Sequence, residues 1–142
     1  MADTRFIKRE VEPYIRKWLS RKFRGIPVIE KSMGFQSGSH KFDGVSIDET
    51  IVASFLCNRP KTGAGNENTG AVRKALNDLQ YLRLIKANKR LIVCTDKDFL
   101  ALIKKRACRI GTDGIEFVFC PLPDSLRQRL EIVLNERRKE QA

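Results

Sequence analysis

The feature that most constrains this chain is the run "TIVASFLC", residues 50–57, in which only Thr50 and Ser54 are polar. Side chains of a strand point alternately to its two faces, so a strand that is apolar at nearly every position needs cover on both. The run therefore predicts a central strand between layers of helices, which is an α/β architecture.

The rest of the chain alternates helical and strand-like patterns, with no internal repeat. We expect helices at residues 4–23, 69–88, 96–106 and 123–140, and strands at 26–31, 40–46, 50–57, 90–95 and 114–122. Residues 32–39, "SMGFQSGS", are expected to form a turn. The order predicts an αβββαβ core with a mixed central sheet flanked by helices, and the length suits a single domain spanning residues 1–142.

The first helix is supported by apolar residues at helical spacing. These are Ile7, Val11, Ile15, Trp18 and Leu19. Pro13 lacks an amide hydrogen, so the pattern predicts either a kink there or a helix that starts near Glu12 with Pro13 in its first turn.

Charge gives the first indication of function. Lys and Arg number 28 against 17 acidic residues, a net charge of +11, and residues 58–142 carry +8 of it. Such an excess suits a polyanion, so nucleic acid, DNA in particular, is the expected partner. A cationic surface kept for solubility, or for an acidic protein partner, is the alternative. No segment resembles a membrane span or a signal peptide, so we expect a cytoplasmic protein without a membrane partner.

The four cysteines are widely spaced and form no C-x-x-C pair. Cys57, Cys94 and Cys120 close apolar runs, where a thiol behaves as a small apolar group. We expect reduced, buried thiols rather than a zinc site.

The predicted element order, the "FDG" of residues 42–44 and the apolar third strand resemble the PD-(D/E)XK, or restriction-endonuclease-like, superfamily. The stretch "SGSHKFDGVSIDETIVASF", residues 37–55, resembles small bacterial nuclease-like members, and the likeness covers about residues 4–94. It implies a site in which carboxylates hold Mg²⁺ or Mn²⁺ for phosphodiester hydrolysis and a lysine stabilises developing charge.

By this resemblance Asp43 matches the acid of the family and is the candidate metal ligand. The Glu and Lys of the motif fall on Ser54 and Leu56, so the motif is degenerate at these two positions. No change of register repairs it, because residues 50–57 contain neither an acid nor a lysine. Asp43 also precedes a glycine, and ordering the hairpin is its alternative role.

A catalytic centre that has migrated would use other residues. Glu10 or Glu12 on the first helix could join Asp43, and Lys41 or Lys74 could replace the missing lysine. Both glutamates are otherwise solvated helix positions.

Nucleic-acid contacts are expected at five residues around the hairpin and the loop after the third strand. They are His40, Arg59, Lys61, Arg73 and Lys74. The loop "KTGAGNENTG" lacks the Gly-Lys-Ser/Thr ending of a Walker A loop, and an incidental surface loop is its alternative interpretation.

Three hypotheses follow from these observations. The first is a nucleic-acid-binding, nuclease-like protein without efficient catalysis, with no certain cofactor. The second is an active nuclease that depends on Mg²⁺ or Mn²⁺ at a migrated site. The third is a protein-interaction module, such as a homodimeric or regulatory subunit.

Overall fold

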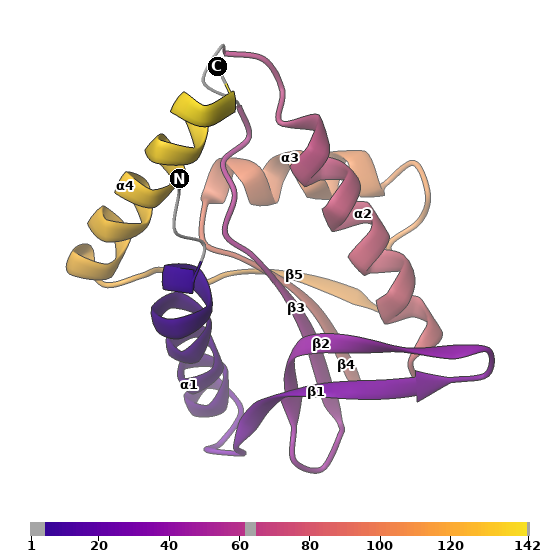
Figure 1. The fold of residues 1–142 in the computed structure, drawn as a ribbon. Coiled ribbons are helices and arrows are strands. Elements are labelled where there is room, and N and C mark those ends of the chain that lie inside the picture. The colour runs from indigo at the N-terminus through magenta and orange to yellow at the C-terminus, as the bar shows by residue number, and fades with distance from the viewer. Residues whose placement is uncertain (1–4, 62–64, 142) are drawn as a thin grey trace.

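The computed structural model describes residues 5–61 and 65–141 (Figure 1). Its elements, in chain order, are a π-helical turn η1 (Ile7–Val11), α1 (Glu12–Lys22), β1 (Val28–Phe35), β2 (Gly38–Ser46), β3 (Ile51–Leu56), α2 (Thr69–Leu84), β4 (Lys89–Cys94), α3 (Lys97–Ala107), β5 (Ile115–Phe119) and α4 (Asp124–Gln141). The predicted αβββαβ order is confirmed, with a further helix, strand and helix placed as expected.

The five strands form one mixed sheet in the order β1-β2-β3-β4-β5. The first three strands form an antiparallel meander, whereas β4 runs parallel to β3 and β5 runs parallel to β4. All six residues of β3 are buried. The prediction of a central strand covered on both faces is therefore confirmed.

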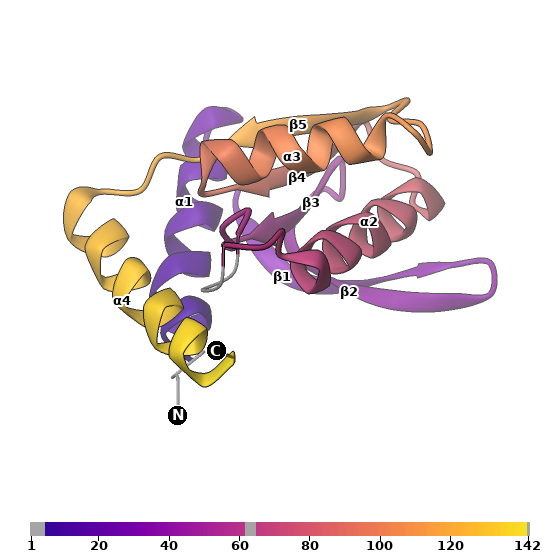
Figure 2. The same ribbon diagram turned by 90° about the horizontal axis from the view of Figure 1, so that it is seen from above.

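Two apolar cores lie on opposite faces of the sheet. One face packs against α2 and α3 and receives Val52 and Leu56 of β3, and the other packs against α1 and α4 and receives Ala53, Phe55 and Cys57. Figure 2 shows α1 and α4 on the other side of the sheet from α2. We call them the α2 face and the α1 face.

The hairpin between β1 and β2 is longer than the sequence predicted. Phe35 pairs with Gly38, so the turn consists of Gln36 and Ser37 alone, and the prediction of a turn over 32–39 is wrong. Gly34 and the serines resemble turn residues, but Met33 and Phe35 pack on the α2 face, and this burial favours the extended strand.

A β-bulge in β2 determines which side chains reach each face. Lys31 pairs with Phe42 and Ile29 with Val45, so Asp43 and Gly44 together lie opposite Glu30 alone. The extra residue lets Phe42 and Val45 both point into the core of the α2 face. Asp43 therefore turns to the α1 face.

Helix α1 begins at Glu12 with Pro13 in its first turn, as the second predicted alternative has it, and the π turn η1 precedes it directly. The amide of Glu12 donates to the carbonyl of Ile7, five residues earlier, and Pro13 lies in the first turn of α1. The expected apolar stripe is confirmed, since Val11, Ile15 and Leu19 are fully buried.

Helix α2 ends at Leu84, four residues before the predicted end. Ile85 adopts an extended conformation and is buried, which stops the helix. The guanidinium group of Arg90 donates hydrogen bonds to the carbonyls of Leu82, Arg83 and Ile85 at 3.4–3.5 Å, so these carbonyls have partners at the helix end.

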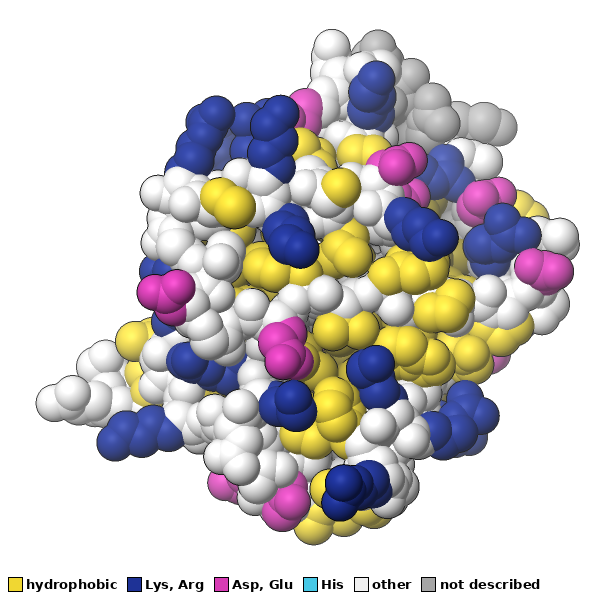
Figure 3. All heavy atoms as spheres, turned by 180° about the vertical axis from the view of Figure 1, so that it is seen from behind, with side chains coloured by type: hydrophobic (Ala, Val, Ile, Leu, Met, Phe, Trp, Pro, Cys, Tyr) yellow, Lys and Arg dark blue, Asp and Glu magenta, His cyan; other side chains and the backbone are white. Residues whose placement is uncertain are grey.

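The cysteines are free, and Cys57, Cys94 and Cys120 are buried as expected, while Cys108 is exposed. Among the described helices, none combines the length and apolar character needed to cross a bilayer. On the face in Figure 3, Lys and Arg side chains are spread around an apolar area and form no single stripe.

Replacing Gly44 with alanine should destabilise the fold. A Cβ at this position would lie 2.8 Å from Cζ of Phe55 and 3.1 Å from Cγ1 of Val28. We expect the free energy of unfolding to fall by about 1–3 kcal/mol in chemical denaturation. In the control Gly70→Ala, no atom of the described residues outside the local helix backbone lies within 4 Å of the new Cβ. That variant should be neutral or slightly stabilising, and an equal loss in both would refute the packing argument.

Candidate metal and phosphate site

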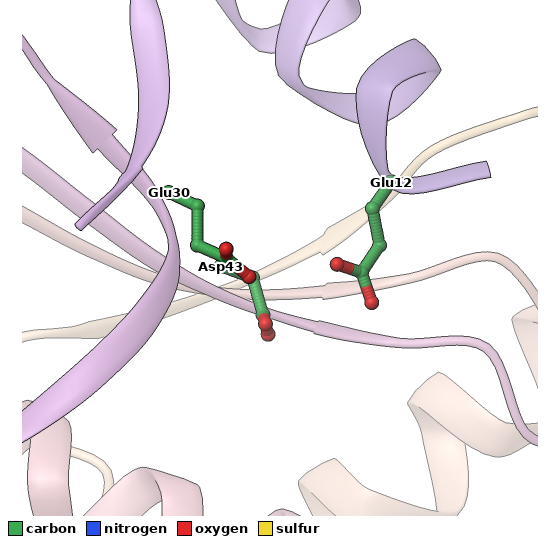
Figure 4. A group of neighbouring side chains, drawn as sticks. All are labelled: Glu12, Glu30 and Asp43. Atoms are coloured by element: carbon green, nitrogen blue, oxygen red, sulfur yellow. The ribbon is translucent and has the colours of Figure 1, made fainter. Parts of the chain in front are cut away.

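Three carboxylates from three elements converge on the α1 face. Glu12 begins α1, Glu30 lies in β1 and Asp43 lies in the bulge of β2. One oxygen from each lies within 4.8 Å of the others. Figure 4 shows Glu12 reaching from the helix toward Asp43, beside Glu30. We call these residues the acidic trio.

The position of Asp43 follows from the divergence of two strands. Backbone pairing between β2 and β3 covers only Gly44 with Ala53 and Val45 with Val52. Beyond it, Oδ2 of Asp43 accepts a hydrogen bond of 2.8 Å from the amide of Phe55. The carboxylate thus replaces a backbone partner and is fixed at the point where the strands separate.

A pocket of about 250 Å³ opens beside this carboxylate. Its lining residues are Ile7, Lys8, Glu12, Asp43, Phe55, Cys57, Asn58 and Lys74. Phe55 of β3 and Cys57, directly after β3, line it, whereas Ser54 and Leu56, the predicted degenerate positions, do not. Ser54 is 2% exposed and Leu56 belongs to the core of the α2 face. Neither Phe55 nor Cys57 is an acid or a lysine, so this part of the chain brings no charged group to the pocket.

Glu12 is the most enclosed member of the acidic trio. It is 8% exposed, and its Oε1 has no hydrogen-bond partner among the described residues. The guanidinium group of Arg16 lies 4.0 Å from this oxygen. Burial raises the pKa of Glu12 above its ordinary value, and the charge of Asp43 adds to this, while Lys8 and Arg16 oppose it.

Glu30 is instead paired. The ammonium group of Lys41 lies 3.1 Å from one carboxylate oxygen and that of Lys8 lies 3.9 Å from the other. The hydrogen bond from Lys41 is the main reason why the pKa of Glu30 lies below its ordinary value. Lys41, a predicted site residue, thus neutralises part of the acidic trio.

The pocket also contains a cation, Lys74 of α2. Burial raises the pKa of Asp43, while the Phe55 amide and Lys74 act to lower it. Burial acts to lower the pKa of Lys74, but attraction by Asp78, and less by Asp43 and Glu12, outweighs it, so the pKa is raised. Lys74 therefore stays an ammonium ion at neutral pH.

The donor set fits a hard divalent cation. Mg²⁺ and Mn²⁺ take carboxylate oxygens, and Glu12 offers a buried oxygen that nothing else in the described residues satisfies. Lys74 is placed to interact with an anionic ligand in the same pocket. The arrangement can thus hold a cation and a phosphate side by side.

The other predicted residues lie elsewhere. Glu10 is exposed and does not line the pocket. The ring of His40 stacks on Tyr81 at 3.8 Å, against the α2 face. Arg59 donates to Oδ1 of Asn135 at 2.9 Å. Lys61 and Arg73 are exposed on the loop and on α2. Of the five predicted nucleic-acid contacts, only Lys74 lines this pocket.

Two residues near the pocket were not predicted. Glu30 lies opposite Asp43 across the hairpin, and pairing from a turn at Gln36 and Ser37 would have identified it. Asp78, one turn after Lys74 on α2, is 6% exposed and accepts a hydrogen bond from it at 3.0 Å. An acidic residue in the apolar stripe of the predicted helix was the available signal.

Comparison with known proteins gives no match. No family model matches the chain, and neither a curated protein nor a solved structure is significantly similar to it. The interpretation of the site therefore depends on its geometry.

The raised pKa of Glu12 predicts a stability that depends on pH. A carboxyl group with a folded-state pKa above its unfolded value of about 4.5 favours folding when protonated, and this contribution is lost as pH rises through the folded pKa. Glu12→Gln should therefore increase the free energy of unfolding at pH 7 by about 1 kcal/mol, with the gain shrinking toward pH 4.

Denaturation of wild type and variant across this range measures the effect. The exposed neighbour provides the control Glu10→Gln, which should change little at any pH. A gain from Glu12→Gln that stays constant with pH would show that ionisation of Glu12 is not its cause.

Proposed function

We propose that this protein is a divalent-cation-dependent phosphodiesterase that acts on nucleic acid, with its catalytic carboxylates displaced from the third strand. The observation that carries the proposal is the convergence of Glu12, Glu30 and Asp43 within 4.8 Å beside a pocket that also contains Lys74. The αβββαβ order and the likeness to the PD-(D/E)XK superfamily support it, and the restriction-endonuclease-like fold is part of the proposal.

The roles of the residues follow from their chemistry. Glu12 and Asp43, with Glu30, would hold Mg²⁺ or Mn²⁺, which when bound stabilises charge at a phosphate and lowers the pKa of water. Lys74 would interact with the phosphate and offset the negative charge that grows on its oxygens. Asp43 is held at a fixed place by the Phe55 amide, so one ligand is already oriented.

The substrate class rests on charge. A net charge of +11 creates an electrostatic field that attracts polyanions at distances longer than those of direct contacts. DNA is the favoured substrate.

One observation favours a second candidate function, nucleic-acid binding without cleavage. The lining residues in β3 and directly after it are Phe55 and Cys57, and neither can bind Mg²⁺ well or neutralise a phosphate. Under this alternative the basic surface alone would bind nucleic acid, with an affinity that falls steeply as salt is raised.

Titration of Mn²⁺ and Mg²⁺ into the protein by calorimetry, together with a plasmid-nicking assay on the same samples, tests the proposal. We expect micromolar Mn²⁺ binding and nicking that requires the metal. Asp43→Asn keeps an acceptor for the Phe55 amide but loses the charge, so it should lower nicking by about a hundredfold or more.

Asp43→Ala should abolish binding of the metal as well. The control Asp124→Asn removes an exposed acid at the start of α4, paired with Arg127, and should leave both measurements unchanged. Salt-sensitive DNA binding with neither metal binding nor nicking would instead support the second candidate.

A further inference from the structure

Asp78 is a costly residue at its position in the fold. It lies within α2, on the buried side of the helix, and its side chain is 9% exposed. Aspartate is a poor residue for a helix interior, and burying a carboxylate costs free energy unless a partner compensates for it. The partner that the structure gives Asp78 is Lys74, one turn earlier.

The contact is a charge-assisted hydrogen bond. Nζ of Lys74 donates to Oδ2 of Asp78 at 3.0 Å. The two groups differ in their surroundings, because the side chain of Lys74 is 60% exposed and that of Asp78 is enclosed. The enclosed carboxylate has few alternative positions, so it is the anchor and the long lysine chain is the group that it restrains.

Without this anchor Lys74 would have other acceptors. Asp43 and Glu12 line the same pocket and attract the ammonium group electrostatically. A lysine bound to either carboxylate would block a ligand atom that the cation needs, and it would be drawn away from the phosphate.

We propose that Asp78 is a positioning residue that holds the ammonium group of Lys74 away from Glu12 and Asp43, so that these two carboxylates remain open to a divalent cation and the ammonium remains open to phosphate. This inference rests on the proposed function. It assigns Lys74 the role of a fixed cation beside the phosphate, while Glu12 and Asp43 would hold the metal that lowers the pKa of water.

The test is a double-mutant cycle of Asp78→Asn, Lys74→Met and the two together. Asp78→Asn keeps the shape of the side chain but removes its charge, so Lys74 should move to Asp43 or Glu12. We expect the Kd for Mn²⁺, measured by calorimetry, to rise about tenfold, and kcat for cleavage of an oligonucleotide to fall by about as much, with KM almost unchanged.

In the Lys74→Met background, adding Asp78→Asn should change the Kd for Mn²⁺ by less than about twofold, because the ammonium that Asp78 restrains is then absent. Equal effects of Asp78→Asn in the two backgrounds would overturn the inference while leaving the proposed function intact. Asp124→Asn, which breaks an exposed pair on α4, is the matched control and should have no effect in either background.

A third measurement does not depend on metal or catalysis. NMR relaxation of the lysine side chains should show Lys74 more ordered than the exposed Lys105 in wild type. Equal mobility in wild type would refute the anchor. An ordered Lys74 in a protein that neither binds Mn²⁺ nor cleaves would keep the anchor but overturn the proposed function, and with it the role of Asp78 in catalysis.

Discussion

The bulge in β2 is the constraint on which the rest of the structure depends. A regular strand would send Phe42 and Val45 to opposite faces, since they are three residues apart. With two residues opposite Glu30, both side chains enter the core of the α2 face. The same irregularity turns Asp43 to the other face and ends the pairing of β2 with β3, which leaves the Phe55 amide for its carboxylate. One extra residue thus creates both a complete core and the opening beside it.

The sequence predicted the parts of this protein that depend on local pattern. The α/β class, the element order and the buried third strand followed from periodicity, and Asp43 and Glu12 were identified through the family resemblance. The candidate site as a whole could not be predicted, because Glu30 comes near Asp43 only through the register of a hairpin whose turn was placed wrongly. Burial of Met33 and Phe35 overrode the local turn preference of their neighbours. His40 shows the converse, since its partner Tyr81 lies 41 positions away on α2 and no local pattern indicates their stacking.

The charges around the acidic trio are arranged in opposing pairs. Glu30 is neutralised by Lys41 and Lys8, Glu12 lies 4.0 Å from the guanidinium group of Arg16, and Lys74 is bound to Asp78. Glu12 is the most enclosed member of the acidic trio, and its charge has the weakest pairing. Its burial is the main reason why its pKa is raised.

The π turn at Ile7–Val11 has a consequence for how this helix tolerates change in length. A π turn contains one residue more than the α-helical turn it replaces, and each residue of an α-helix accounts for about 100° of rotation. Residues before Val11 are thus rotated relative to the register that α1 imposes on the sheet, and Ile7 and Lys8 line the pocket because of this offset. Removing a single residue from the turn would leave Val11, Ile15 and Leu19 packed as they are. It would rotate Ile7 and Lys8, which line the pocket, about the helix axis. The shape of the pocket can therefore change by insertion or deletion, and the cost to the core is limited to the contacts that Phe6 and Ile7 make with it.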